Sequence, residues 1–167
     1  MISVDKYNDN KFSITIPAWS EDSLCEPVWF YICEDQYNLY INTIQKAKAK
    51  YIEWVNIAKN NNIENHTKVI PLEAIVDVCF NYKGQSYFQF NVNQKIIFYV
   101  SRSFGKIEYL LLLVIENIKS YDNENITSGN INLVFTSSKE IQDFIDAISL
   151  ENINAFRANP KTEELFK

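Results

Sequence analysis

Residues 35–62 read DQYNLYINTIQKAKAKYIEWVNIAKNNN, and their apolar side chains recur at alternating steps of three and four positions. This spacing follows the turn of an α-helix and predicts a helix with one apolar face. The Asp35 carboxylate can accept a hydrogen bond from a free N–H of the first helical turn. The three asparagines at 60–62 favour a turn over a helix, so the helix should end there. At 1.5 Å per residue the helix is roughly 38 Å long, enough to cross a whole sheet. The stripe expected to be buried consists of Tyr37, Tyr40, Ile44, Ala47, Tyr51, Trp54 and Ala58.

On both sides of this helix the apolar period changes to two, which indicates β-strands. Short links between consecutive strands favour an antiparallel meander. We expect a first strand that stops at Pro17, and turns at Lys83-Gly84, Asn93-Gln94 and residues 103–106. The expected strands are residues 12–16, 28–33, 73–82, 87–92, 96–100, 109–115 and 131–135.

The last helix has a recognisable start at residues 137–140, Ser-Ser-Lys-Glu, which form a capping box. The pattern as a whole predicts an α+β fold: an antiparallel β-meander, a long helix from the N-terminal half packed on the sheet, and a C-terminal capping helix. No linker divides the chain, so residues 1–167 are expected to form one domain. Residues 1–10 are expected to be a frayed end or an edge strand, and residues 160–167 are expected to be a frayed end.

This order of elements is similar to two known layouts. A cystatin-like layout wraps a sheet around a long helix, and a pleckstrin-homology-like layout ends in a meander and a capping helix. No motif specific to either family accompanies the similarity, so it concerns layout alone.

Composition and charge exclude several functions. The chain has 167 residues and a net charge of −5. An acidic chain repels nucleic acid and anionic lipid, and its only arginines, Arg102 and Arg157, provide little to read base edges. The longest apolar run, residues 109–115, is too short to span a membrane, and no signal peptide is visible. Widely spaced cysteines favour a reducing cytoplasm. The abundance of Asn, Ile and Lys suggests AT-rich bacterial or phage coding sequence.

The search for catalytic chemistry yields no convincing set. His66 is the single histidine, and Cys25, Cys33 and Cys79 lack the surrounding signature of a nucleophile paired with it. The spacings do not match those of metal ligands, and no glycine-rich phosphate loop is present. We therefore expect no catalytic residues, no metal and no cofactor.

The leading hypothesis is a non-catalytic cytoplasmic protein that binds another protein, of the immunity or inhibitor type. Its partner would be a basic toxin or effector, because an acidic surface steers a cationic protein. Trp19 lies in an acidic loop, and an exposed tryptophan among carboxylates is typical of a binding hot spot. The candidate partner-binding residues are Trp19, Glu21, Asp22, Asp122 and Glu124. Nothing in the sequence indicates an oligomeric state.

The alternative is a domain that binds a small molecule, a lipid or a peptide, conceivably with an unrecognised enzymatic site. If the sheet curves around the long helix, a pocket could form between them. Asp77 is notable as an acid that shares a strand face with apolar neighbours. A lipid- or peptide-binding module would instead need basic hairpin tips, for which Lys83, Lys95, Arg102 and Lys106 are candidates. The candidate pocket residues are Tyr37, Tyr51, Asp77 and Phe90.

Overall fold

The computed structural model of the chain describes residues 2–7, 11–120 and 125–158. These residues form strands and helices in an order that begins with three strands, continues with a long helix and four more strands, and ends with two helices. The elements are β1 (Ser3–Tyr7), β2 (Lys11–Ser20), the short 3-10 helix η1 (Ser23–Cys25), β3 (Val28–Cys33), α1 (Glu34–Asn60), β4 (His66–Tyr82), β5 (Gln85–Ser103), β6 (Lys106–Ile115), β7 (Ile131–Phe135), α2 (Ser138–Ala147) and α3 (Leu150–Ala158).

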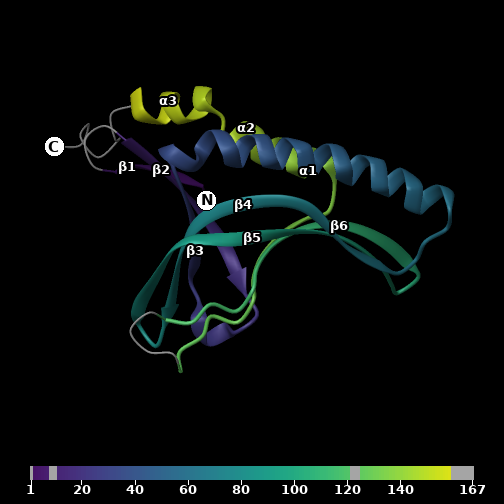
Figure 1. The fold of residues 1–167 in the computed structure, drawn as a ribbon, viewed down its shortest axis with the longest axis horizontal. Coiled ribbons are helices and arrows are strands. Elements are labelled where there is room, and N and C mark those ends of the chain that lie inside the picture. Colours follow the sequence, from purple (N-terminus) through teal and green to yellow (C-terminus); the bar gives the residue numbers. More distant parts are fainter. Residues whose placement is uncertain (1, 8–10, 121–124, 159–167) are drawn as a thin grey trace.

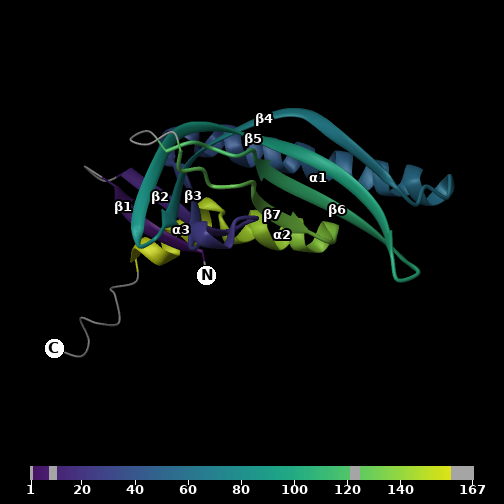
Figure 2. The same ribbon diagram turned by 90° about the horizontal axis from the view of Figure 1, so that it is seen from below.

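Within the described residues, the seven strands form one antiparallel sheet in sequence order, β1 to β7. The sheet curls so far that β7 also pairs with the end of β2, through Trp19 with Asn132 and Ser20 with Ile131. β4, β5 and β6 form a long arch with α1 on one side, and α2 lies beside α1 (Figures 1 and 2). The predicted α+β class, with an antiparallel sheet, a long packed helix and a C-terminal helical cap, is confirmed.

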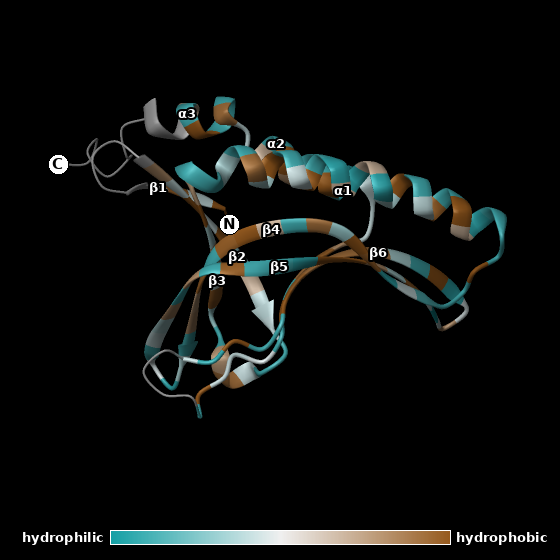
Figure 3. Cartoon of the chain, viewed as in Figure 1, coloured by the Kyte–Doolittle hydropathy of each residue, from teal (hydrophilic) through white to brown (hydrophobic). Residues whose placement is uncertain are grey.

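The apolar stripe of α1 forms the helix side of the core. Six of its seven predicted members are buried, and Trp54 is half-buried. Opposite the helix lie fully buried strand residues such as Phe30, Phe80 and Phe98. Hydrophobic bands occupy the strands beneath α1, whereas α1 itself alternates between hydrophobic and hydrophilic residues (Figure 3).

Two tyrosine hydroxyl groups on this stripe fix the helix against the sheet. The Tyr40 hydroxyl donates to Gln94 Oε1 at 3.1 Å, inside the core. The Tyr51 hydroxyl lies 2.9 Å from the carbonyl oxygen of Tyr109 and 3.2 Å from that of Thr136. Burial raises the pKa of Tyr40, and it raises the pKa of Tyr51 to about 12. Both hydroxyl groups therefore remain protonated donors across the physiological range.

The turn predicted at Asn93-Gln94 is wrong, because β5 runs through it as a single strand. Asn93 and Gln94 pair regularly with Ile75 and Ala74, and a β-bulge lies just before them, where the pairing of β4 with β5 shifts register between Val76 and Val78. Asn91 takes a positive φ of 55° at this irregularity, a conformation that asparagine tolerates better than most residues. The bulge bends the strand pair without ending it.

Two predicted boundaries also differ from the structure. β2 does not stop at Pro17 but continues to Ser20. Pro17 pairs with Trp29 of β3 on one side. On the other side it lies between the part of β2 that pairs with β1 and the part that pairs with β7, where no strand needs its missing N–H. Helix α1 is capped by Cys33 rather than Asp35, because β3 runs directly into the helix.

Other local predictions are confirmed. Lys83-Gly84 and Phe104-Gly105 are both hairpin turns with two successive positive φ angles. Asn60 ends α1, and the Ser137 hydroxyl caps α2 by accepting from the Glu140 N–H at 3.2 Å. None of the helices in the described part of the chain is long and apolar enough to cross a membrane.

Replacing Trp54 by alanine tests the contact between α1 and the sheet. The Trp54 ring meets the Phe98 ring edge-on, with 5.7 Å between centroids. Trp54→Ala should lower the free energy of unfolding by about 3 kcal/mol, the lower end for a large aromatic side chain because Trp54 is only half-buried. Urea unfolding measures the change. Leu39→Ala on the same helix, where the side chain is 57% exposed, should change it by less than about 0.5 kcal/mol. Equal losses would contradict this packing.

Candidate functional site

The end of β2 meets β7 at a surface that carries three of the predicted partner-binding residues. We call residues 19–26 together with residues 127–134 the β2–β7 seam. Trp19 pairs with Asn132 across it, and its side chain is 58% exposed. Leu24 and Val134, also within the seam, are 59% and 46% exposed. The seam thus presents large apolar groups to solvent.

Hydrogen bonds between the two segments fix the backbone of the seam. The buried Ser20 hydroxyl donates to the Ser128 carbonyl and accepts from the Asp22 N–H at 3.0 Å. The Cys25 thiol donates to the carbonyl of Thr127 at 3.1 Å. The contacts of Ser20 with Ser128 and of Cys25 with Thr127 join residues more than 100 positions apart, so the closed sheet holds the loop that follows Trp19 in one conformation.

The carboxylates of the seam are held by neutral donors. Glu21 accepts from the side-chain amides of Asn130 at 2.9 Å and Asn132 at 3.4 Å. Asp22 accepts from the N–H of Leu24 at 2.9 Å and thereby caps η1. Glu26 accepts from the N–H of Ser20 at 2.7 Å. Neutral N–H groups orient these carboxylates without cancelling their charge, so the seam has fixed negative charge beside exposed apolar side chains.

Asp122 and Glu124, the other predicted partner-binding residues, lie outside the described residues. The segments that flank them pair with each other and meet the seam at Ser128: Ser120 N donates to the Ile126 carbonyl at 2.8 Å, and Ser128 N donates to the Ile118 carbonyl at 3.0 Å.

The four predicted pocket residues separate into two groups. Tyr37 is buried in an edge-on contact with Phe12, with ring centroids 5.6 Å apart, and Tyr51 is buried further along α1. Asp77 and Phe90 instead line a cavity of about 320 Å³ at the start of α1. The lining of this cavity includes neither tyrosine. The structure therefore joins Asp77 with Phe90 and places both tyrosines in the helix–sheet core.

Asp77 in this cavity has two defined contacts. One carboxylate oxygen accepts from the N–H of Asn91 at 2.8 Å, and the other accepts from the Cys33 thiol at 3.4 Å. Burial, together with the negative charge of Asp77, raises the pKa of Cys33. Glu34 and Asp35 in the first turn of α1 also line the cavity, which gives it an acidic wall beside the exposed ring of Phe90.

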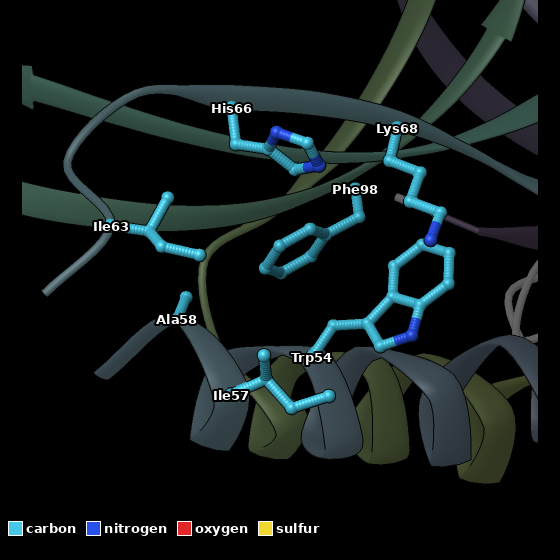
Figure 4. A pocket seen from close by; sticks show the side chains of 7 residues that line it. All are labelled: Trp54, Ile57, Ala58, Ile63, His66, Lys68 and Phe98. Carbon is cyan, nitrogen blue, oxygen red and sulfur yellow. The ribbon is translucent and has the colours of Figure 1, made fainter. Parts of the chain in front are cut away.

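A second cavity lies near the C-terminal end of α1, where the helix faces the first part of β4 (Figure 4). It measures about 110 Å³. The sequence reasoning missed this group because it left residues 66–72 outside any strand. Counting the alternation back from Val76 in steps of two would have placed Ile70, Lys68 and His66 on one face. The cavity is lined by Trp54, Ile57, Ala58, Ile63, His66, Lys68 and Phe98.

The cysteines and the histidine lie in separate environments. His66 is exposed at the start of β4, and no cysteine lines the cavity beside it. Burial raises the pKa of Cys25 to about 11 and also raises the pKa of Cys79. These thiols are therefore protonated at neutral pH and poorly nucleophilic. Among residues 2–7, 11–120 and 125–158, no cluster of His, Cys, Asp and Glu side chains could hold a metal ion.

The basic hairpin residues do not form one patch. Lys83 lies at the β4–β5 turn and Lys106 begins β6 after the β5–β6 turn, which are opposite ends of β5. Lys95 contacts Glu116 at 2.5 Å, and Arg102 contacts Glu64 at 2.7 Å. Two of the four cations are thus paired with carboxylates, and the four are distributed along the length of the arch.

Gly129 provides a test of how tightly the seam is fixed. Its φ is +66°, and an added Cβ would lie 3.0 Å from the backbone nitrogen of Asp22. Gly129→Ala should therefore cost roughly 2–3 kcal/mol, of which about 1 kcal/mol is conformational strain and the rest is displacement of the loop. Gly84→Ala is the matched control, since Gly84 has φ +82° and open space around it, and should cost only about 1 kcal/mol. Urea unfolding of both variants measures the difference. Equal costs would mean that the loop yields without resistance.

Comparison of the chain with protein-family models, with curated proteins and with solved structures finds no match. We therefore infer function from the residues of this chain alone.

Proposed function

We propose that the protein is a non-catalytic binding module whose β2–β7 seam docks a basic protein. A neutralising protein of the immunity or inhibitor type, acting on a cationic toxin or effector in the cytoplasm, is the specific role that we favour. The observation that carries the proposal is the exposed Trp19 side chain held beside the oriented carboxylates of Glu21 and Asp22.

The apolar part of the seam provides the anchor. Tryptophan is enriched among residues that dominate binding energy, because it buries a large area and loses little conformational freedom. Trp19 emerges from a paired strand position, so its backbone is already fixed before a partner arrives. Leu24 and Val134 extend the apolar area around it. Preorganisation of this kind lowers the entropic cost of association.

The charged part of the seam favours a cationic partner. The carboxylates of Glu21, Asp22 and Glu26 all accept from neutral N–H groups. The whole chain carries a net charge of −5. Like charges repel and opposite charges accelerate encounter, so these carboxylates would select a basic surface and speed its approach. A toxin that acts on nucleic acid needs such a basic surface, which an acidic protein could cover.

Identification of the partner should start from Trp19 itself. A photo-crosslinking phenylalanine analogue placed at position 19 should capture a basic protein from the native host under low salt. The same analogue at position 39, where Leu39 is exposed on α1, is the matched control and should not capture it. Capture from both positions, or of acidic proteins alone, would count against the seam.

Association and dissociation rates measured with the purified partner then distinguish the role of Trp19 as an anchor from the electrostatic steering by the carboxylates. Trp19→Ala should mainly speed dissociation, by about tenfold or more, as loss of a hot-spot anchor does. Glu21→Gln keeps the size and an acceptor oxygen but removes the charge, and should mainly slow association. Raising the salt concentration to about 0.5 M shortens the Debye length to a few Å and should slow association of the wild type by roughly tenfold.

The control for charge is Glu108→Gln, an exposed carboxylate on β6 away from the seam. It should leave both rate constants within about twofold of wild type, because distant exposed charges are screened. A rate of association that is independent of salt, with Trp19→Ala binding like wild type, would place the interface elsewhere.

A second candidate function, binding of a small molecule, is favoured by the cavity that joins Asp77 and Phe90. Its volume of about 320 Å³ suits a small ligand. The carboxylates of Glu34, Asp35 and Asp77 in its wall would favour a cationic group, with Phe90 against an apolar body.

Phenethylamine tests this second candidate, with phenylacetate as the probe of opposite charge. The amine should shift the amide resonance of Asn91, whose N–H contacts Asp77, whereas phenylacetate should not. Asp77→Asn keeps an acceptor for the Asn91 N–H and should weaken binding of the amine by about tenfold. Glu73→Gln, outside the cavity, should leave binding of the amine unchanged. Equal responses to both probes would remove the candidate.

A further inference from the structure

The cavity near the C-terminal end of α1 has an apolar floor and an open mouth. Phe98 and Ala58 at its base are each 2% exposed. Trp54 and Ile57 from α1 and Ile63 from the following turn form its lower and side walls (Figure 4). An apolar cavity of roughly 150 Å³ can hold benzene. The 110 Å³ measured here therefore suits a short alkyl chain or a small ring.

Two basic side chains occupy the opposite wall. His66 and Lys68 extend from β4 toward the helix, on the same strand face as the buried Ile70 (Figure 4). The strand face that carries the buried Ile70 is otherwise apolar toward the core, yet at these two exposed positions it carries an imidazole and an ammonium group. Lys68 is exposed, and its Nζ lies 4.5 Å from the centroid of the Trp54 ring, so the charge lies on the solvent side of the cavity.

Acidic side chains do not neutralise this wall. No carboxylate is among the residues that line the cavity. The nearby Glu64 is engaged by Arg102, with both carboxylate oxygens 2.7 Å from the same guanidinium nitrogen. The cation of Lys68 thus faces an apolar cavity with the Trp54 ring as its described contact.

We propose that this cavity binds a small carboxylate with an apolar body. The apolar part enters between Trp54 and Phe98, and the carboxylate remains at the mouth beside Lys68 and His66. The ammonium group attracts the anion, and the open mouth leaves the charged group partly hydrated, which avoids the cost of burying it. This site shares no residue with the β2–β7 seam, so it stands or fails independently of the proposed partner.

Hexanoate is the probe, with hexan-1-ol and hexylamine as controls that keep the chain and change the charge. The readout is the indole N–H resonance of Trp54 in a ¹H–¹⁵N spectrum, assigned by its loss in Trp54→Phe. Hexanoate should shift this resonance in a saturable manner with a dissociation constant on the order of 1 mM, as expected for so few heavy atoms. Hexan-1-ol should bind at least about fivefold more weakly, and hexylamine should leave the resonance unmoved at the same concentration.

Variants separate charge from shape. Lys68→Met retains an apolar stem over Trp54 and removes the cation. It should therefore raise the dissociation constant of hexanoate by about tenfold and leave that of hexan-1-ol unchanged. Lys106→Met, at the distant β5–β6 turn, is the matched control and should bind hexanoate like wild type. Ala58→Leu fills the floor and should abolish binding of both hexanoate and hexan-1-ol, with the remaining spectrum showing that the fold is retained.

Three results would overturn the proposal. They are a Trp54 resonance that hexanoate leaves unmoved up to about 20 mM, binding of hexan-1-ol as tight as that of hexanoate, and binding of hexanoate to Lys68→Met as tight as to the wild type. The first would show a cavity that takes no such ligand, and the other two would show a cavity without preference for an anion.

Discussion

The structure depends on the contact between one face of α1 and the concave side of the curled sheet. Three of the seven buried residues of this face are tyrosines, and the hydroxyl of a buried tyrosine needs a partner. Tyr40 finds it in Gln94 of β5, and Tyr51 in the carbonyls of Tyr109 and Thr136. A stripe of leucines could slide along a sheet at small cost, but these hydrogen bonds are satisfied at one axial position of the helix. They therefore fix α1 relative to β5, β6 and the start of α2.

This position of the helix determines where surface chemistry can develop. Because α1 covers the middle of the sheet, cavities remain near its two ends, one beside Asp77 and one beside Lys68. The cavity at the start of α1 is acidic, and the one near its end is basic. The helix dipole has the same polarity, since it favours acids such as Glu34 in the first turn and bases such as Lys59 in the last. Acidic residues that stabilise the start of the helix thus also contribute to the ligand preference proposed for the acidic cavity. The basic cavity differs, because its cation, Lys68, lies on the sheet and not on the helix.

Curling of the sheet has a separate consequence at the far end of β2. For β7 to reach β2, the long strands must bend, and the register shifts between β4 and β5 are irregularities of the kind that bends strands. Closure brings Ser20 against Ser128 and orients Glu21 through Asn130 and Asn132. The acidic surface proposed to bind a partner is therefore a product of closure, and the close approach of Gly129 to Asp22 shows how little space it leaves.

Sequence alone determined the long helix, most strands, two hairpin turns and the start of α2, because each rests on local periodicity or on a few neighbouring side chains. It also determined that Trp19 lies among acidic residues.

Tertiary structure decided the remaining features. Asn93 and Gln94 look like a turn locally, and only their pairing with Ile75 and Ala74 of β4 carries the strand through them. Asp77 and Phe90 share a cavity, whereas Tyr37 and Tyr51 lie in the core. Lys68 meets Trp54 across thirteen intervening positions and a change of element, a contact that no local pattern can specify, because it depends on how helix and sheet pack.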